Sequence, residues 1–389
     1  MCRAGYASSW MGRLSQRLCS LSMASDRDWR EAWLEADRYA FGEAAPDRHP
    51  ATTLQALLAR APNGFDVDRY GGGELAERLE RRVAELLGKE AAVWMPSGTM
   101  AQQVALRIHA ERTGRSVVAF HPQCHLEAHE EGAYHALHGL RATLLGGRER
   151  LIETKDVEEL REPIAALLIE LPQRDLGGQL PPWDDLVATC EAARARGVAL
   201  HLDGARLWQC GPFYERPLAE IAALCDTIYV SFYKDLGAPA GCALAGPEDV
   251  IQEARVWQIR HGGRLFHAYP YLLAAELGLD ERLPRMPELV ERTRLAGEAL
   301  AAIDDVAVVP DPPQAAMLHV IVRRPLEALN DAVYELTRES GIWLSSEFSA
   351  TGDPGSQRCE LSVTAANLAV PIDEVVECWS ELLRRAAGV

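Results

Sequence analysis

From residue 91 onward, two patterns of apolar positions alternate along the chain. Short apolar runs of strand length are separated by stretches in which apolar residues recur at helical spacing. Two of the predicted helices cover 100–110 and 184–196. The alternation is typical of an α/β domain with a mostly parallel sheet. The predicted strands are 91–95, 117–120, 142–145, 164–169, 198–202, 227–230 and 242–245.

Different patterns flank this domain. Residues 28–61 have helical spacing, and a glycine-rich turn at 70–73 leads into another amphipathic helix. After residue 279 the pattern predicts a helix over 287–303, a strand-helix-strand unit at 317–322, 326–340 and 360–363, and a last helix over 373–385. We therefore expect a large α/β domain over 64–280, a smaller C-terminal α+β domain over 281–389 and an N-terminal arm over 26–63.

The first 25 residues are a separate case. They contain arginine and serine but no acidic residue, which resembles the composition of a targeting peptide. A clear hydrophobic segment is missing, so we interpret residues 1–25 as a disordered extension outside the fold.

Composition limits the classes of function. The formal net charge of -17 and the pI near 5.2 argue against a nucleic-acid or anionic-membrane surface, because phosphate binding needs clustered basic residues. No apolar run approaches the roughly 20 residues of a membrane helix. The nine cysteines form no CxxC pair, which favours reduced thiols in a cytoplasmic protein. We expect a small-molecule enzyme.

Lysine usage points to one position. Only Lys89, Lys155 and Lys234 are lysine among the 40 basic residues. Lys234 follows the predicted strand 227–230 and precedes a glycine-containing turn into the next buried run. An amine can be deprotonated and attack a carbonyl, which a guanidinium cannot do. We therefore interpret Lys234 as a reactive amine, whereas Lys89 and Lys155 fit solvated surface positions.

Two other predicted strands also end in polar residues. Met95 is followed by Pro-Ser97-Gly98-Thr99, where free backbone amides at a helix start suit a phosphate and glycine lets a ligand come close. Simple helix capping is the alternative. Strand 198–202 ends in Asp203, whose partner is either Arg206 or the protonated nitrogen of a ligand. A phosphate site, a carboxylate and a reactive amine together match the needs of pyridoxal phosphate.

Three segments resemble those of the threonine aldolase and β-eliminating lyase family, which consists of fold-type-I pyridoxal-phosphate enzymes. They are Val93-Trp-Met-Pro-Ser-Gly-Thr-Met100, His201-Leu-Asp-Gly-Ala-Arg206 and Ser231-Phe-Tyr-Lys-Asp-Leu-Gly-Ala-Pro-Ala-Gly241. The similarity runs from about residue 66 to 246 and continues more faintly to the C-terminus. It implies a lyase that cleaves the Cα–Cβ bond of a β-hydroxy-α-amino acid to give glycine and an aldehyde.

The resemblance also implies roles for individual residues. Lys234 would bind the cofactor's aldehyde, and Asp203 its ring nitrogen. Gly98 and Thr99, beside Ser97, would bind the phosphate. His125 would stack on the cofactor ring and assist proton transfer, and Arg206 would lie near the substrate carboxylate or the cofactor. A homodimer or homotetramer with active sites at the subunit boundary is implied as well.

The chain departs from the family pattern where the substrate carboxylate would bind. An Arg-Ser-Asp-Thr stretch near the N-terminus is missing, and Arg358 matches the C-terminal arginine only if the register is shifted. Arg174 is a possible substitute. Together with Arg206 and Tyr70, these arginines are our candidates for substrate binding. The departures leave β-elimination, transamination or racemisation open as alternative chemistries.

Histidines are dense between His121 and His138, which raises a different hypothesis. His125 and His129 share a helix face at i, i+4, so a metal-dependent hydrolase built on this cluster is an alternative. The spacing is not HExxH, and we expect no metal. A non-catalytic relative that uses the fold for binding is a further alternative.

Overall fold

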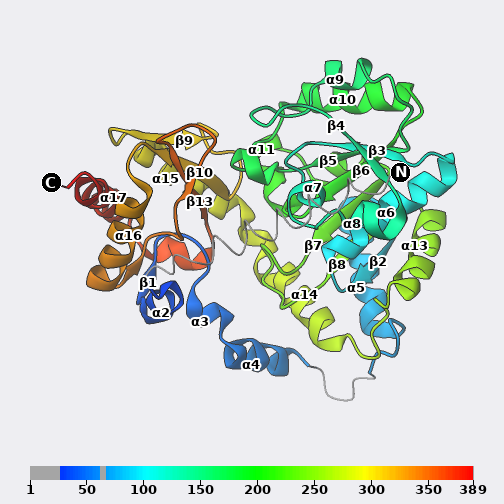
Figure 1. Cartoon of the computed structure of the whole chain (residues 1–389). Helices are drawn as coiled ribbons and strands as arrows, with labels where there is room; N and C mark the ends of the chain where they lie inside the picture. The colour runs from blue at the N-terminus through cyan, green and yellow to red at the C-terminus, as the bar shows by residue number, and fades with distance from the viewer. Residues whose placement is uncertain (1–26, 62–66, 389) are drawn as a thin grey trace, which may run out of the picture.

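The computed structural model describes residues 27–61 and 67–388 and has two lobes (Figure 1). The larger lobe is built on a seven-stranded sheet in the order β2-β8-β7-β6-β5-β3-β4. All neighbours in this sheet are parallel except β8, which runs antiparallel to both β2 and β7. The strands are β2 (Ala91–Met95), β3 (Val117–Phe120), β4 (Arg141–Leu144), β5 (Ala166–Glu170), β6 (Ala199–Gly204), β7 (Thr227–Ser231) and β8 (Cys242–Gly246).

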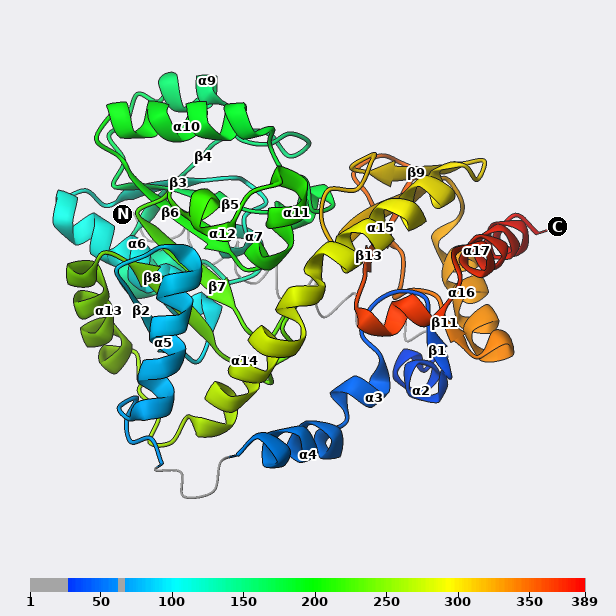
Figure 2. The same ribbon diagram turned by 180° about the vertical axis from the view of Figure 1, so that it is seen from behind.

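Both faces of this sheet are covered by helices. Trp94, Leu200 and Leu202 belong to the core shared with α5 (Glu74–Leu87), α10 (Trp183–Ala195) and α14 (Tyr269–Glu281). Alternate positions such as Val93 and Leu244 pack under α6 (Gly98–Thr113) and α13 (Glu248–Arg260). Figure 2 shows α5 and α14 on the near side of the sheet. Because both faces are buried, the strands appear in the sequence as continuous apolar runs.

The smaller lobe contains an antiparallel sheet in the order β12-β13-β10-β9. Three long helices belong to this lobe, and the last of them, α17 (Ile372–Ala386), ends the chain (Figure 1). The strands are β9 (Val306–Val309), β10 (Met317–Val322), β12 (Ser349–Ala350) and β13 (Gln357–Ser362). The other two long helices are α15 (Met286–Ala301) and α16 (Leu326–Ser340).

The first part of the N-terminal segment joins the smaller lobe, whereas α4 (Pro50–Arg60) packs on α14 of the larger one. Within the segment, strand β1 (Arg38–Tyr39) pairs in parallel with β11 (Ile342–Trp343). The continuous helical pattern expected over 28–61 is divided into α2 (Trp29–Glu35), α3 (Ala45–Arg48) and α4. Pro46 and Pro50 lie in the first turns of α3 and α4, where proline is tolerated but would break a helix running through them.

The predicted fold class is confirmed, since a large α/β lobe with a mostly parallel sheet accompanies a smaller α+β lobe. The short strands β9 and β11 were not predicted, and several strand ends differ by one or two residues. The domain boundaries at 63/64 and 280/281 stay predictions, and residues 1–25 lie outside the described residues. None of the helices described is both long and apolar enough to cross a bilayer.

Candidate active site

The carboxyl ends of β5, β6 and β7 bring together Glu170, Asp203 and Lys234. Glu170 pairs with Asp203 in the parallel register of β5 and β6, so the two carboxyl groups leave adjacent strand ends. Lys234 lies in the turn that joins β7 to β8, where its N–H donates to Ser231 Oγ at 3.3 Å. In open α/β sheets this edge is where ligands bind.

Asp203 is 1% exposed and is held by two neutral donors. Gln102 Nε2, from α6, donates to Oδ2 at 2.6 Å, and the Ala205 N–H donates to Oδ1 at 3.0 Å. Arg206 does not form the salt bridge with Asp203 that the sequence left open. The carboxylate is therefore fixed in position by neutral groups and can receive a cationic ligand atom.

The amine of Lys234 lies in a strongly polar but desolvated setting. Burial, followed by the positive charge of Arg206, lowers its pKa, while Asp203 and Glu170 act in the opposite direction. The nitrogen Nζ lies 5.9 Å from the ring centre of Tyr233. A lowered pKa makes more of the neutral, nucleophilic amine available at a given pH.

The start of α6 is the candidate anion site, and Ser97 caps the helix there, as the alternative interpretation expected. Ser97 Oγ accepts from the N–H of Met100 at 3.3 Å, and the N–H groups of Gly98 and Thr99 come too early in the helix to have intrahelical partners. A Cβ on Gly98 would lie 2.1 Å from the hydroxyl of Tyr229. Glycine is needed here so that α6 can pack against β7, a reason different from the close ligand approach expected.

His125 lies at the start of the short helix α7 (His125–Ala128) and is oriented by a buried carboxylate. Its Nδ1 is 3.0 Å from Glu130 Oε1, and Gln103 Nε2 donates to the other Glu130 oxygen at 3.3 Å. The backbone N–H of His125 points to Glu170 Oε2 at 3.4 Å. The contact at Nδ1 leaves Nε2 of His125 as the nitrogen available to a ligand.

Glu170 was not a sequence candidate, yet it lies at the centre of the site. Its oxygens accept from the Arg174 N–H and from Gln173 Nε2, each at 3.1 Å. Burial, and then the charge of Asp203, raise the pKa of Glu170 to about 8. Glu170 is therefore mostly protonated at neutral pH and can donate a hydrogen bond or a proton.

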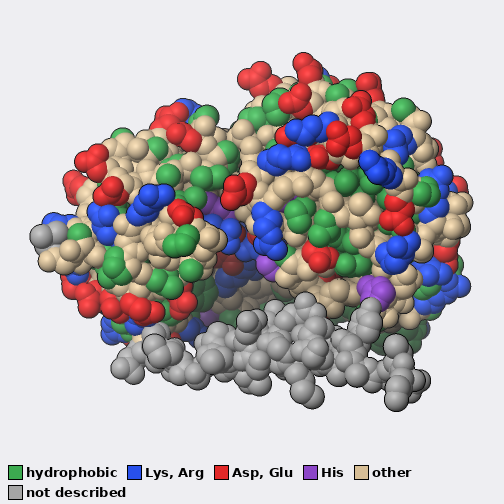
Figure 3. Space-filling model, turned by 45° about the horizontal axis from the view of Figure 1, so that its top comes forward, with side chains coloured by type: hydrophobic (Ala, Val, Ile, Leu, Met, Phe, Trp, Pro, Cys, Tyr) green, Lys and Arg blue, Asp and Glu red, His purple; other side chains and the backbone are tan. Residues whose placement is uncertain are grey.

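The three arginines predicted to bind the substrate differ in the partners of their side chains. Arg174 Nε lies 3.0 Å from Glu360 Oε2 of β13. The guanidinium of Arg206 forms no hydrogen bond with any described residue, whereas its carbonyl oxygen accepts from the Gln209 N–H. The sequence position of Arg358 on β13 places it on the same face as Glu360. Figure 3 shows Lys or Arg and His side chains gathered in the hollow between the lobes.

Tyr70 lies apart from the other candidates in this chain. It is exposed, packs edge-to-face on Phe266, and lines a separate cavity of about 160 Å³ with Trp94 and Arg264. A role for Tyr70 in substrate binding stays a prediction.

Sequence reasoning missed Gln102, Glu130, Glu170 and Glu360. Gln102 lies one turn into a helix, where glutamine is unremarkable, and the other three needed the fold to bring them together. The position of Glu170 at the end of a predicted strand was the one available signal, because Asp203 and Lys234 were recognised by that same criterion.

The rings of His125 and His129 lie 5.1 Å apart, but other histidines between 121 and 138 have different partners. His121 Nε2 contacts the carbonyl oxygens of Gly147 and Arg150, and His135 contacts that of Leu140. Over the described ranges, no three His, Cys, Asp or Glu side chains are placed to hold a metal ion.

The site fits pyridoxal phosphate in the chemistry of its groups. Gln102 Oε1 and Asp235 Oδ2 are buried without a hydrogen-bond partner, which is typical of polar atoms that face a ligand. A fixed carboxylate suits a ring nitrogen, a desolvated amine suits an aldehyde, and a helix start suits a phosphate. These assignments of Asp203, Lys234, Ser97, Gly98 and Thr99 stay predictions.

Comparisons with known proteins agree with this geometry. Residues 47–323 match the family model of the beta-eliminating lyases. The low specificity L-threonine aldolase of Escherichia coli (strain K12) is 31% identical over 261 residues, covering 63% of this chain and 75% of that relative.

Solved structures extend the comparison to the whole fold. A protein assigned as an L-allo-threonine aldolase in Listeria monocytogenes EGD-E superimposes with a TM-score of 0.87 at 36% identity, covering 91% of this chain and 98% of that one. Serine palmitoyltransferase of Sphingomonas wittichii shares the fold alone, with a TM-score of 0.70 at 14% identity over 99% and 100% of the two chains. The chain thus belongs to the beta-eliminating lyase family, the fold-type-I pyridoxal-phosphate-dependent enzymes that include the threonine aldolases.

Proposed function

We propose that this protein is a pyridoxal-phosphate-dependent aldehyde-lyase that cleaves the Cα–Cβ bond of a β-hydroxy-α-amino acid into glycine and an aldehyde. The observation that carries the proposal is the placement of Lys234 and Asp203 at neighbouring strand ends, beside the start of α6. Membership of the family and the 36% identity with the Listeria protein support the choice of reaction.

The residues have separate tasks. Bound pyridoxal phosphate would take up the electron pair released when the Cα–Cβ bond breaks. Lys234 would bind the cofactor covalently until the substrate amine replaces it, and Asp203 would keep a proton on the ring nitrogen. Ser97, Gly98 and Thr99 would hold the phosphate.

Two further groups would act on the substrate. The free guanidinium of Arg206 would bind the α-carboxylate. His125, oriented through Nδ1 by Glu130, would accept the proton of the β-hydroxyl at Nε2, directly or through a water. The neutral Glu170 next to His125 would donate a proton to Cα to give glycine, and the proton held by His125 would balance this loss.

We also propose that the enzyme is cytoplasmic and forms a homo-oligomer. The seven cysteines in the described ranges are free thiols, which supports a reducing compartment. Exposed apolar side chains at Leu54, Leu58, Tyr70 and Phe266 support contact between subunits. Light scattering of the purified protein would determine the number of subunits.

Replacement of Lys234 tests the reaction. We expect Lys234→Ala to lose at least about 1,000-fold in aldehyde release from threonine or phenylserine, because covalent catalysis disappears with the amine. Lys234→Arg keeps the charge and should be equally inactive, whereas Lys155→Ala, a surface lysine paired with Glu153, should behave as wild type.

Products identify the chemistry. Glycine and aldehyde should appear in equal amounts from hydroxyamino acids, and pyruvate and ammonia from a panel of amino acids would instead establish β-elimination. Borohydride reduction should leave the cofactor covalently bound to the wild type but not to Lys234→Ala, which would locate the attachment. Normal aldehyde release by Lys234→Ala would exclude the proposal.

A further inference from the structure

Glu360 lies on the face of the small lobe that meets the active site. Along β13, Cys359 and Leu361 are buried in the core, so Glu360 points from the opposite face. Arg174, from the loop after β5 in the large lobe, places Nε 3.2 Å and 3.0 Å from the two carboxylate oxygens. His319, directly across the ladder on β10, lies 3.6 Å away. The ion pair therefore connects the lobes beside the site.

The carboxylate of Glu360 remains ionised. Burial alone would raise its pKa, but His319, Arg174 and Arg206 outweigh burial and hold the pKa of Glu360 at about 2. Its side chain is 29% exposed, so it still borders the open hollow. The wall beside Arg206, the candidate residue for binding the substrate carboxylate, thus always carries a negative charge.

The two arginines near Glu360 are not equivalent. Arg174 forms an ion pair with Glu360, and its Nη1 also lies 3.8 Å from Asp175 Oδ1. The guanidinium of Arg206 forms no hydrogen bond with any described residue, although its charge acts on Lys234, Asp235 and Glu360. Of these two guanidinium groups, that of Arg174 is paired with a carboxylate and that of Arg206 is free to receive one.

We propose that Glu360 determines the substrate class, admitting amino acids with a single carboxylate and rejecting those with an acidic side chain. This inference rests on the proposed function. Arg206 binds the α-carboxylate, while a second carboxylate meets the negative charge of Glu360 and an arginine that is already paired. Repulsion built into a site is a common source of such discrimination.

Glu360→Gln is the direct test. The amide keeps the size of the side chain, removes the charge and releases Arg174. We expect the Kd of succinate, measured by calorimetry on the cofactor-loaded protein, to fall at least about tenfold. The Kd of butyrate, which has four carbons and one carboxylate, should change less than about threefold. Glu374→Gln, which breaks a two-bond ion pair with Arg38, is the matched control and should change neither Kd.

Two further variants separate specificity from folding. Glu360→Asp keeps the charge and should retain the wild-type preference for butyrate. The double variant Arg174→Gln with Glu360→Gln restores the original charge balance without a free arginine, and we expect it to lose the gain in succinate binding. If Glu360→Gln does not fold, Arg174→Gln alone decides the matter, because an uncompensated Glu360 should weaken succinate more than butyrate.

Turnover gives an independent measure of the same effect. The kcat/KM ratio of 3-hydroxyaspartate to threonine should rise at least about tenfold in Glu360→Gln. An unchanged succinate-to-butyrate ratio, or an equal gain for both acids, would overturn the assignment of Glu360. Because succinate and butyrate are not cleaved, an intact binding contrast without threonine cleavage would overturn only the proposed reaction, and cleavage without the contrast only the present inference.

Discussion

Asp203 illustrates how neighbours prepare a charged residue for a ligand. It is 1% exposed, and both donors that contact it, Gln102 and the N–H of Ala205, are neutral. Gln102 keeps its own Oε1 unpaired. Burying a carboxylate in this way is unfavourable until a cation arrives, so part of the affinity for a protonated ring would come from relief of that cost.

The first prediction concerns Gln102. Gln102→Leu removes the 2.6 Å hydrogen bond and should weaken the hold on the ionised form of Asp203. We expect the Kd of pyridoxal phosphate to rise about 10- to 100-fold, in line with about 1.5–3 kcal/mol for a hydrogen bond to a charged group. Fluorescence titration of the apoprotein would measure it. Gln252→Leu on the surface is the control, and equal Kd values for both variants would contradict the role of Gln102.

Residues differ in how far the sequence alone could predict them. Lys234 and Asp203 were predicted because each follows an apolar strand, where a charged residue requires a reason. Glu360 was not predicted, because its strand alternates buried and half-buried positions and gives no sign of which lobe it faces. The pairing of Glu360 with Arg174 joins residues 186 positions apart, which only the folded chain reveals.

At the scale of elements, α6, β6 and β7 are joined behind the site by two histidines. His109 Nε2 and His201 Nδ1 both contact Thr227 Oγ1, at 2.8 and 2.9 Å. Burial lowers the pKa of His109 to about 4 and that of His201 to about 3, so both are neutral in the folded protein. The contact aligns α6, and with it the start of that helix, against the central strands.

The second prediction follows from these pKa values. Unfolded histidines take up protons below their usual pKa of 6.5, whereas the folded ones do so only near 3 and 4. Stability should therefore be complete above pH 6.5 and fall as the pH drops. Between pH 7 and pH 5 we expect a loss of about 2 kcal/mol for each histidine.

Urea unfolding at several pH values would measure the effect. His109→Gln cannot take up the proton and should lose about half of the acid sensitivity attributed to the pair. His135→Gln, at an exposed position, should keep the wild-type pH dependence. Identical slopes for wild type and His109→Gln would contradict the assignment.

Elements were predicted well where packing makes the pattern strong. The strands of the large sheet are buried on both faces, so their apolar runs stand out, and β10 and α16 match their expected limits of 317–322 and 326–340. The strands β1 and β11 have two residues each, and they exist because they pair with one another across 304 positions of sequence. Such pairing leaves no local pattern to detect.

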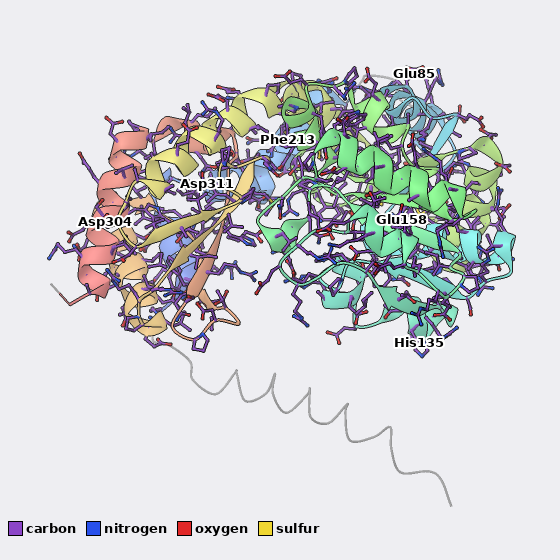
Figure 4. The ribbon with its side chains drawn as sticks, turned by 90° about the horizontal axis from the view of Figure 1, so that it is seen from above. Glu85, His135, Glu158, Phe213, Asp304 and Asp311 are labelled. Carbon is purple, nitrogen blue, oxygen red and sulfur yellow. The ribbon has the colours of Figure 1, made fainter. Side chains whose placement is uncertain are left out.

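For the whole molecule, one loop of the large lobe makes a close contact with the small lobe. Residues 177–180 lie against β9 and β10, where Leu180 N–H donates to Gln314 Oε1 at 2.7 Å. Gly177 has φ +76°, and a Cβ there would lie 2.1 Å from the carbonyl oxygen of Val309. In Figure 4, Phe213 of α11 (Cys210–Tyr214) lies near this junction, and Asp304 lies far from it.

The third prediction compares two glycines. Gly177→Ala and Gly197→Ala place alanine at similar positive φ values, +76° and +66°, but only Gly177 faces another element. We expect Gly177→Ala to lower the free energy of unfolding by about 2 kcal/mol more than Gly197→Ala. Because Arg174 lies in the same loop, Gly177→Ala should also raise KM for threonine.

Differential scanning calorimetry and steady-state kinetics would measure both effects. Equal losses of stability in the two variants, with unchanged KM, would show that the junction between the lobes adapts without consequence for the site.

The antiparallel course of β8 has a consequence for how the enzyme could exchange its cofactor. Lys234 lies in a hairpin whose two strands are each hydrogen-bonded on both sides within the central sheet. The backbone on both sides of Lys234 is therefore held in place by the sheet, and the amine has little freedom to move away from the site. Any opening of the site that lets the cofactor enter or leave must then come from movement of the small lobe on the other side of the site.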